Sequence, residues 1–315
     1  MTTTTDTPAL ASWQAWRAAR ERALHADPHG WLTLIGLHWL DATPRSLAGI
    51  PGQWWADDDG AHVRAEATEG LRRGLDGERL DGELVESLPE AGSTILASFA
   101  ADREFRANDA TVTDEAAHSD QVPAVGETAD GDQVPAVGET PDAEGRIALE
   151  LALRTGRYVV RVRDPRAPTR RDFAGVPTHD YDPDWDLDVR VRWYAAPRPE
   201  VVGGAQPGLE HHVEVVGEVE LEREGVLITL RLTAGHGNGD AALLFSDTTD
   251  DTAPWRILAV PRPAGAEPGT TGRLRLDLNR TINLPFAFSD FGTCPRPVAG
   301  NDVPFAVTAG EKVPR

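Results

Sequence analysis

The feature that most constrains the fold is an alternation of apolar and polar side chains with a period of two. It is clearest over residues 146–164, on either side of Thr155 and Gly156. Because successive side chains of a strand point to opposite faces, this pattern predicts a β-hairpin with one buried face. Similar short strands are predicted at residues 187–193, 213–221, 226–232, 241–245, 255–260, 274–278 and 303–307. Many short, evenly spaced strands favour a sandwich or barrel over an α/β sheet.

One helix is predicted before the first strand. Residues 8–25 place apolar side chains near helical spacing, and Thr7 followed by Pro8 is typical of a helix start. Residues 27–30 form a turn signal that ends the helix. The expected fold class is therefore mainly β: a short N-terminal helix, a small β subdomain and a larger β-sandwich or barrel-like domain.

An acidic segment divides the chain. Residues 107–145 hold ten acidic residues and no Lys or Arg, and the sequence DQVPAVGET occurs in them twice, at residues 120–128 and 132–140. Two copies are too few for a solenoid, so we interpret the segment as a duplicated, solvated loop. We expect four segments: a helix and apolar stretch at residues 1–40, a small β subdomain at 41–106, the acidic loop at 107–145 and a C-terminal β domain at 146–315.

The charge of the chain limits its partners. It carries 51 acidic and 31 basic residues, a net charge of −20, so we expect no nucleic-acid partner. Cys294 is the only cysteine and cannot form an intrachain disulfide. The first residues show no signal-peptide pattern, and the longest mostly apolar stretch, residues 31–40, is shorter than the ~20 residues of a membrane span. We expect a cytoplasmic protein without a membrane partner, its oligomeric state left open.

Acidic residues and histidines do not make a metal pattern. Aspartates alternate over residues 180–188, but a calcium loop starting at Asp180 would place Trp185 where glycine is needed and Val191 where glutamate is needed. His211 and His212 are adjacent, so in a strand they point to opposite faces. We predict no metal and no cofactor.

The most unusual stretch lies near the C-terminus. Asp277, Asn279, Arg280 and Asn283 are close together and border a segment rich in Phe and Pro. A polar row at a strand end, followed by such a loop, could line a pocket. Alternatively, these side chains satisfy buried backbone groups of a long irregular loop.

This stretch resembles the signature of the DUF1684 family, proteins of unknown function. Similarity to the family also covers Trp16-Arg17, Gly30–Leu32 and Gly36–Leu40 near the N-terminus, and Arg163-Asp164, Phe173–Gly175 and Asp182-Pro183 in the middle. The signature itself is carried by Asp277, Asn279, Arg280, Asn283, Pro285, Ala287, Phe288, Thr293, Cys294, Pro295, Asn301, Ala309, Gly310, Glu311 and Lys312.

The sequence departs from the family pattern at two places. Residues 252–255 replace a glycine-rich run, of which only the following Arg256 is kept, and Phe286 stands at a cysteine position. The resemblance also implies a forkhead-associated-like β-sandwich over residues 41–104, although no residue there marks a phosphopeptide site.

Three functional hypotheses follow, and whether the protein is an enzyme stays open. The first is a binding module for a small polar or anionic ligand, with a pocket at Arg256, Asp277, Asn279, Arg280, Asn283, Glu311 and Lys312. The second is a hydrolase in which Asp277 is the general base and Arg280 an electrostatic stabiliser. The third is a purely structural motif. An open pocket would favour the first two, and buried, mutually hydrogen-bonded side chains the third.

Overall fold

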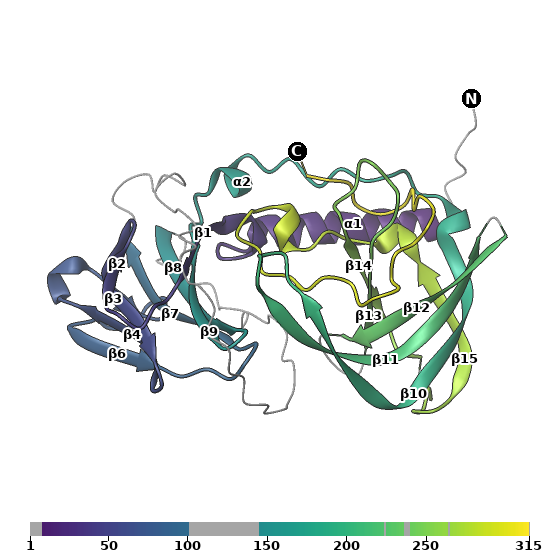
Figure 1. The fold of residues 1–315 in the computed structure, drawn as a ribbon. Helices are drawn as coiled ribbons and strands as arrows, with labels where there is room; N and C mark the ends of the chain where they lie inside the picture. The colour runs from purple at the N-terminus through teal and green to yellow at the C-terminus, as the bar shows by residue number, and fades with distance from the viewer. Residues whose placement is uncertain (1–7, 101–144, 224, 236–239, 264, 315) are drawn as a thin grey trace. The chain divides into compact units, whose positions relative to one another are not determined.

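The structure is a computed structural model of the chain, and it describes residues 8–100, 145–223, 225–235, 240–263 and 265–314 (Figure 1). The chain forms two compact units: a sandwich unit, Asp27–Phe173, and a half-barrel unit, Met1–Ala26 with Ala174–Arg315. Both contain antiparallel sheets, so the expected mainly β class with an N-terminal helix is confirmed. The duplicated sequence expected to form an acidic loop lies outside the described residues.

The sandwich unit contains two sheets. One has the strand order β1-β9-β8-β7-β5 and the other the order β2-β3-β4-β6. Their strands are β1 (Leu34–Trp39), β2 (Arg45–Leu47), β3 (Ile50–Asp57), β4 (Gly60–Ala65), β5 (Arg72–Arg73), β6 (Gly82–Glu86), β7 (Ser93–Ala100), β8 (Arg146–Arg154) and β9 (Arg157–Arg163). Three short helical segments accompany them: η1 (Trp31–Thr33), η2 (Ala67–Glu69) and α2 (Pro168–Arg171).

One hydrophobic core joins the two sheets. Trp54 and Val63 from the smaller sheet and Leu149, Leu151 and Val160 from the larger one are all fully buried in it. Burial of such side chains stabilises a sandwich by about 1.5–3 kcal/mol each. The sequence alternation therefore places one face of each sheet in the same core.

The hairpin expected at residues 146–164 is present as β8 and β9. Its turn residues Thr155 and Gly156 have φ angles of 53° and 67°, the left-handed values that a tight hairpin turn needs. The compact units differ here from the expected segments, because β8 pairs with β7 and β9 pairs with β1. The hairpin thus completes the sandwich rather than opening the C-terminal β domain.

The half-barrel unit is built on one curved six-stranded sheet with the order β14-β13-β12-β11-β10-β15 (Figure 1). Its strands are β10 (Asp186–Gly203), β11 (Glu210–Arg223), β12 (Val226–Ala234), β13 (Ala241–Phe245), β14 (Arg256–Val260) and β15 (Thr271–Asp277). Helix α1 (Pro8–Ala26) matches the predicted helix, and Trp13 and Leu24 are its buried residues. The 3-10 turns are η5 (Pro183–Trp185), η6 (Leu278–Arg280) and η7 (Pro285–Ala287).

The two faces of this sheet differ in character. On β10, Val189 and Val191 are buried in the core, whereas Asp188 and Arg190 are exposed. The exposed side chains form cross-strand ion pairs, including Arg273 with Asp188, Arg190 with Glu220 and Arg192 with Glu218. The outer face therefore presents arginines that are already matched with acids.

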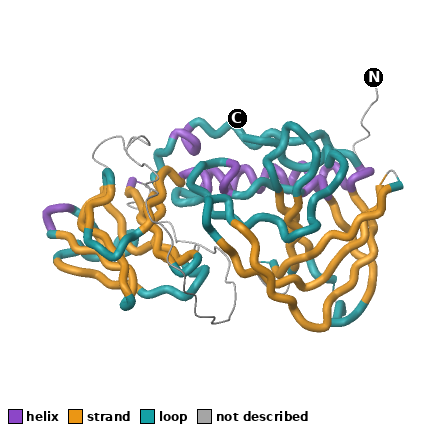
Figure 2. The backbone as a smooth tube through the Cα atoms, viewed as in Figure 1, coloured by secondary structure: helices purple, strands orange, loops and turns teal. Residues whose placement is uncertain are grey.

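The chain after β15, residues 278–314, is here called the tail, and Figure 2 shows it mostly as loop. The strand predicted at residues 303–307 is wrong. Pro304 has no N–H to donate, and this stretch has a single neighbouring bridge, between Ser246 and Asp302. Val303, Val307 and Ala309 nevertheless lie in the core of the half-barrel unit. No helix among the described residues is long and apolar enough to cross a membrane.

Candidate functional site

Arg256 is the central residue of the candidate site. It lies on β14 opposite Phe245 and is 0% exposed. One terminal amine donates to the backbone oxygens of Ala309 and Glu311, at 2.6 and 3.1 Å. The other donates to Asp247 at 2.7 Å and to the backbone oxygen of Val307 at 3.0 Å. Arg256 therefore binds three carbonyls of the tail at once.

The electrostatics of Arg256 follow from its burial. Burial lowers the pKa of the guanidinium, and the carboxylate of Asp247 opposes this shift. An arginine stays charged in proteins, so the buried positive charge needs its buried carboxylate. Asp247 also accepts a hydrogen bond from the backbone N–H of Val307, at 3.3 Å. Both residues of the Arg256–Asp247 pair therefore hold the tail: Arg256 through tail carbonyls and Asp247 through the Val307 N–H.

Asp277 and Asn279 lie where β15 ends. Asp277 caps η6: it accepts from the backbone N–H of Asn279 at 3.2 Å and from its side-chain amide at 3.0 Å. Its other oxygen accepts from Arg280 at 3.0 Å. Asn279, expected on a strand face, is instead buried in a 3-10 turn and exchanges hydrogen bonds with the backbone of Asp182. The Asp277 carboxylate accepts three hydrogen bonds, one of them from a cation, which does not favour a general base.

Asn283 and Glu311 join the tail to itself. Glu311 is 4% exposed, and one of its oxygens accepts from the backbone N–H of Asn283 at 2.7 Å. The Asn283 amide donates to the backbone oxygen of Lys312 at 2.8 Å. These two buried side chains hold the stretches around residues 283 and 311 side by side.

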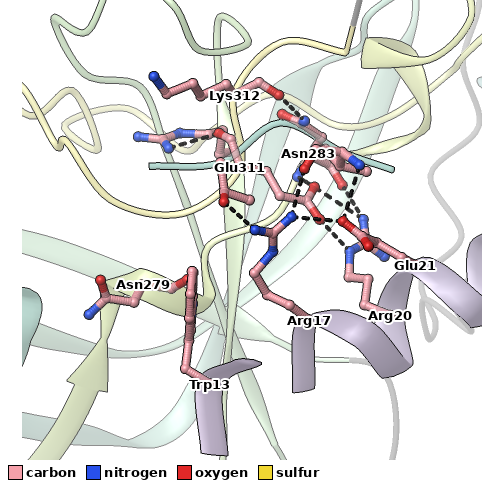
Figure 3. Close-up of polar contacts among 11 residues, drawn as sticks. Trp13, Arg17, Arg20, Glu21, Asn279, Asn283, Glu311 and Lys312 are labelled. Atoms are coloured by element: carbon pink, nitrogen blue, oxygen red, sulfur yellow. Dashed lines mark hydrogen bonds and ion pairs between the residues drawn. The ribbon is translucent and has the colours of Figure 1, made fainter. Parts of the chain in front are cut away.

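Helix α1 supplies a polar stripe that the sequence analysis did not include in the site (Figure 3). Arg20 donates to Glu311 at 2.7 Å, and Trp13 donates through its indole N–H to the backbone oxygen of Asn279 at 2.8 Å. Arg17 donates to Thr178 at 2.5 Å and to the backbone oxygen of Val176 at 2.8 Å. Positions 13, 17 and 20 share one helix face, so their spacing was the available signal.

Lys312 also has a carboxylate partner. Its amine lies 2.7 Å from Asp251 and lowers the pKa of that carboxyl. His179 lies on the other side of Asp251, at 3.4 Å, and burial lowers the pKa of its ring. Asn301 also holds the tail, with an amide that bonds the backbone of Arg231 and of Leu244.

The candidate cations are thus paired one to one with carboxylates: Arg20 with Glu311, Arg256 with Asp247, Arg280 with Asp277, and Lys312 with Asp251. The structure brings Arg256, Asn283, Glu311 and Lys312 together around the tail, while Asp277, Asn279 and Arg280 form a second group at the end of β15. Two buried atoms of the first group, Arg256 Nε and Asn283 Oδ1, have no hydrogen-bond partner, and neither has Oγ1 of the nearby Thr281.

The two departures from the family pattern meet in space. Trp255 and Phe286 stack with ring centroids 4.1 Å apart and an interplanar angle of 26°. They belong to a small apolar cluster with Leu284 and Cys294. The substituted positions 255 and 286 are therefore filled by one aromatic pair, and the buried Cys294 lies beside it.

The aspartates of residues 180–188, considered above as a calcium loop, are not arranged as metal ligands. Asp186 and Asp188 pair with Arg275 and Arg273 on the outer face, and Asp182 caps η5. Among the described residues, no group of three or more His, Cys, Asp or Glu side chains could hold a metal ion.

Fold and site together define a mainly β protein whose C-terminal tail is fastened by buried polar side chains. Residues 171–312 match the model of DUF1684, described as a protein of unknown function, which confirms the resemblance over that range. An uncharacterized protein of Haloarcula marismortui, solved by solution NMR, is 23% identical, with a TM-score of 0.37 and coverage of 46% of this chain and 79% of that chain. None of the curated proteins matches the sequence.

Proposed function

We propose that Asn283 and Glu311 of the DUF1684 signature act here in a structural clamp that fixes the tail and α1 within the half-barrel unit. The clamp also includes Arg20, Asp247 and Arg256, which lie outside the signature. The observation that carries the proposal is Arg256, which is 0% exposed and donates to three tail carbonyls. A guanidinium whose terminal amines are all engaged would have to lose the tail before it could meet a ligand.

Charge matching supports the same proposal. The cations of the candidate site are each paired with a carboxylate, so little of their positive charge remains to attract an anion. We also propose that the protein has no nucleic-acid partner, because the composition is acidic and the outer-face arginines are paired with acids. A cytoplasmic location is proposed as well, in keeping with a single cysteine that can form no intrachain disulfide.

Glu311→Gln tests the clamp, because Gln keeps the shape but removes the charge that holds Arg20 and the Asn283 N–H. Hydrogen exchange of the full chain should become faster in two distant peptides together, residues 8–26 and 305–313. Glu218→Gln is the matched control, since Glu218 accepts from Arg192 and Tyr194 on the other face. Unchanged exchange in both peptides of Glu311→Gln would refute the clamp.

A small polar ligand is the second candidate, as in the binding-module hypothesis. The three unpartnered buried atoms favour it, because Arg256, Thr281 and Asn283 all bond the backbone of Glu311 or Lys312 and so lie around the same stretch. The test is a thermal-shift screen with small carboxylates, phosphates, polar neutral metabolites and divalent chlorides. A ligand at about 100 times its Kd adds ~2.7 kcal/mol to native stability. A folded protein that no compound stabilises would count against this candidate.

A further inference from the structure

The sandwich unit holds a histidine that is fixed at both ring nitrogens. His62 lies on β4, on the face of the four-stranded sheet that points away from the core. Its Nε2 is 2.8 Å from Asp57 at the end of β3, and its Nδ1 is 3.0 Å from Glu83 on β6. A single side chain on the middle strand therefore contacts both neighbouring strands.

The geometry defines the protonation state of this ring. An ionised carboxylate can only accept hydrogen bonds, so two carboxylates on two nitrogens require an N–H at each, which makes the ring an imidazolium. The hydrogen bonds from His62, and at Glu83 first of all those from Arg64, lower the pKa of Asp57 and of Glu83. Both carboxyls are therefore ionised near neutral pH.

Every neighbouring strand contributes to this arrangement. From β3, Trp55 stacks on the imidazole with centroids 4.7 Å apart and an interplanar angle of 13°. From β4 itself, Arg64 donates to the second oxygen of Glu83 at 2.7 Å and lies over the Trp55 ring. Burial lowers the pKa of His62, but the hydrogen bonds of Glu83 and Asp57 outweigh it, so the pKa is raised above 6.5.

We propose that His62 is a proton-dependent fastener of β6, which is the edge strand of the four-stranded sheet. When the ring is protonated, it holds Glu83 on β6 and Asp57 on β3 together. When it loses its proton, the ring keeps an N–H on one side only, and the bond that remains is no longer charge-assisted in either tautomer. The link between β4 and β6 is therefore weaker whichever nitrogen is deprotonated, and β6 is the strand to loosen first because it lies at the edge of the strand order.

The first experiment is an NMR titration of the imidazole signals in the full chain. His62 should titrate with a midpoint above about 6.5, the ordinary histidine value. Asp57→Asn keeps the side-chain shape and leaves the Arg64–Glu83 pair in place, and it should move the midpoint down. A wild-type midpoint at or below the ordinary value, or one that Asp57→Asn leaves unchanged, would overturn the proposal.

The second experiment measures the consequence for the strand. Protection factors of the β6 amides, corrected for the intrinsic effect of pH, should fall severalfold between about pH 6 and about pH 9. His62→Phe retains a ring against Trp55 but has no proton to lose, so its β6 protection should not change over this range. Equal pH dependence of β6 protection in the wild type and in His62→Phe would contradict the proposal. If His62→Phe does not fold, the titration of Asp57→Asn decides the question on its own.

Discussion

Two arginine–carboxylate pairs of the half-barrel unit have nearly the same N–O separation and opposite surroundings. Arg256 lies 2.7 Å from Asp247, with side chains that are 0% and 2% exposed. Arg273 lies 2.8 Å from Asp188, with side chains that are 64% and 67% exposed. Water screens the outer pair, whereas the inner pair has only its protein partners. The same two residue types therefore hold a tail in one place and cover a sheet face in the other.

The contrast in burial between these two pairs bears on how the polar residues of a family signature are interpreted. A charged pair at the surface is easily broken and can meet a ligand. In the interior, neither residue of a charged pair can leave the other to bind a ligand, because the remaining residue would be an uncompensated buried charge. Glu311 of the DUF1684 signature and its neighbour Arg256 belong to the second kind, and the arginines of β15 belong to the first.

Replacing Arg256 by Met should have the largest effect. The change leaves Asp247 buried without its cation and the carbonyls of Val307, Ala309 and Glu311 without their donor. The free energy of unfolding should fall by about 3–5 kcal/mol. Urea unfolding followed by circular dichroism measures the loss, and Arg273→Met is the matched control. A loss similar to that of the control would mean that the inner pair is not essential to the tail.

The fold was predictable where side-chain pattern alone determines it. Alternation predicted the hairpin at residues 146–164, and helical spacing predicted the helix at residues 8–25, because burial of one face decides both. Alternation then misled in one place. It failed at residues 303–307, where Val303 and Val307 are buried without a strand. There the backbone groups are satisfied by side chains such as Asp247, and a period-two pattern cannot distinguish this from sheet pairing.

The site was predictable as a set of residues but not as a geometry. Arg256, Asn283 and Glu311 do come together, yet the sequence left open whether they face water or the tail. Arg20 was missed because its contact with Glu311 spans 291 residues, and the helix face that it shares with Trp13 and Arg17 does not show which distant residues that face contacts. Which side chains a tail covers depends on its path over the sheet, and that path is set by tertiary contacts.

Trp13→Phe tests the hydrogen bond between α1 and η6, and its effect on the free energy of unfolding should be intermediate. It keeps an aromatic ring near Tyr181 but removes the N–H that bonds the buried carbonyl of Asn279. The free energy of unfolding should fall by about 1 kcal/mol, the usual contribution of one such bond. Trp16→Phe is the control, since Trp16 is half-buried below Arg280. An equal loss in both variants would assign the effect to ring size instead of the hydrogen bond.

Arg273→Met should have the smallest effect on stability, and it tests the outer pair of the comparison directly. The outer pair is exposed and screened, so its removal should lower Tm by less than about 2 °C. Adding salt should shrink even this difference, because the attraction in the wild type is screened while the Met variant has none to lose. Thermal unfolding at low and high salt measures both. A large, salt-independent loss would show that Arg273 contributes packing along β10, and the contrast with Arg256 would then rest on contact area instead of charge.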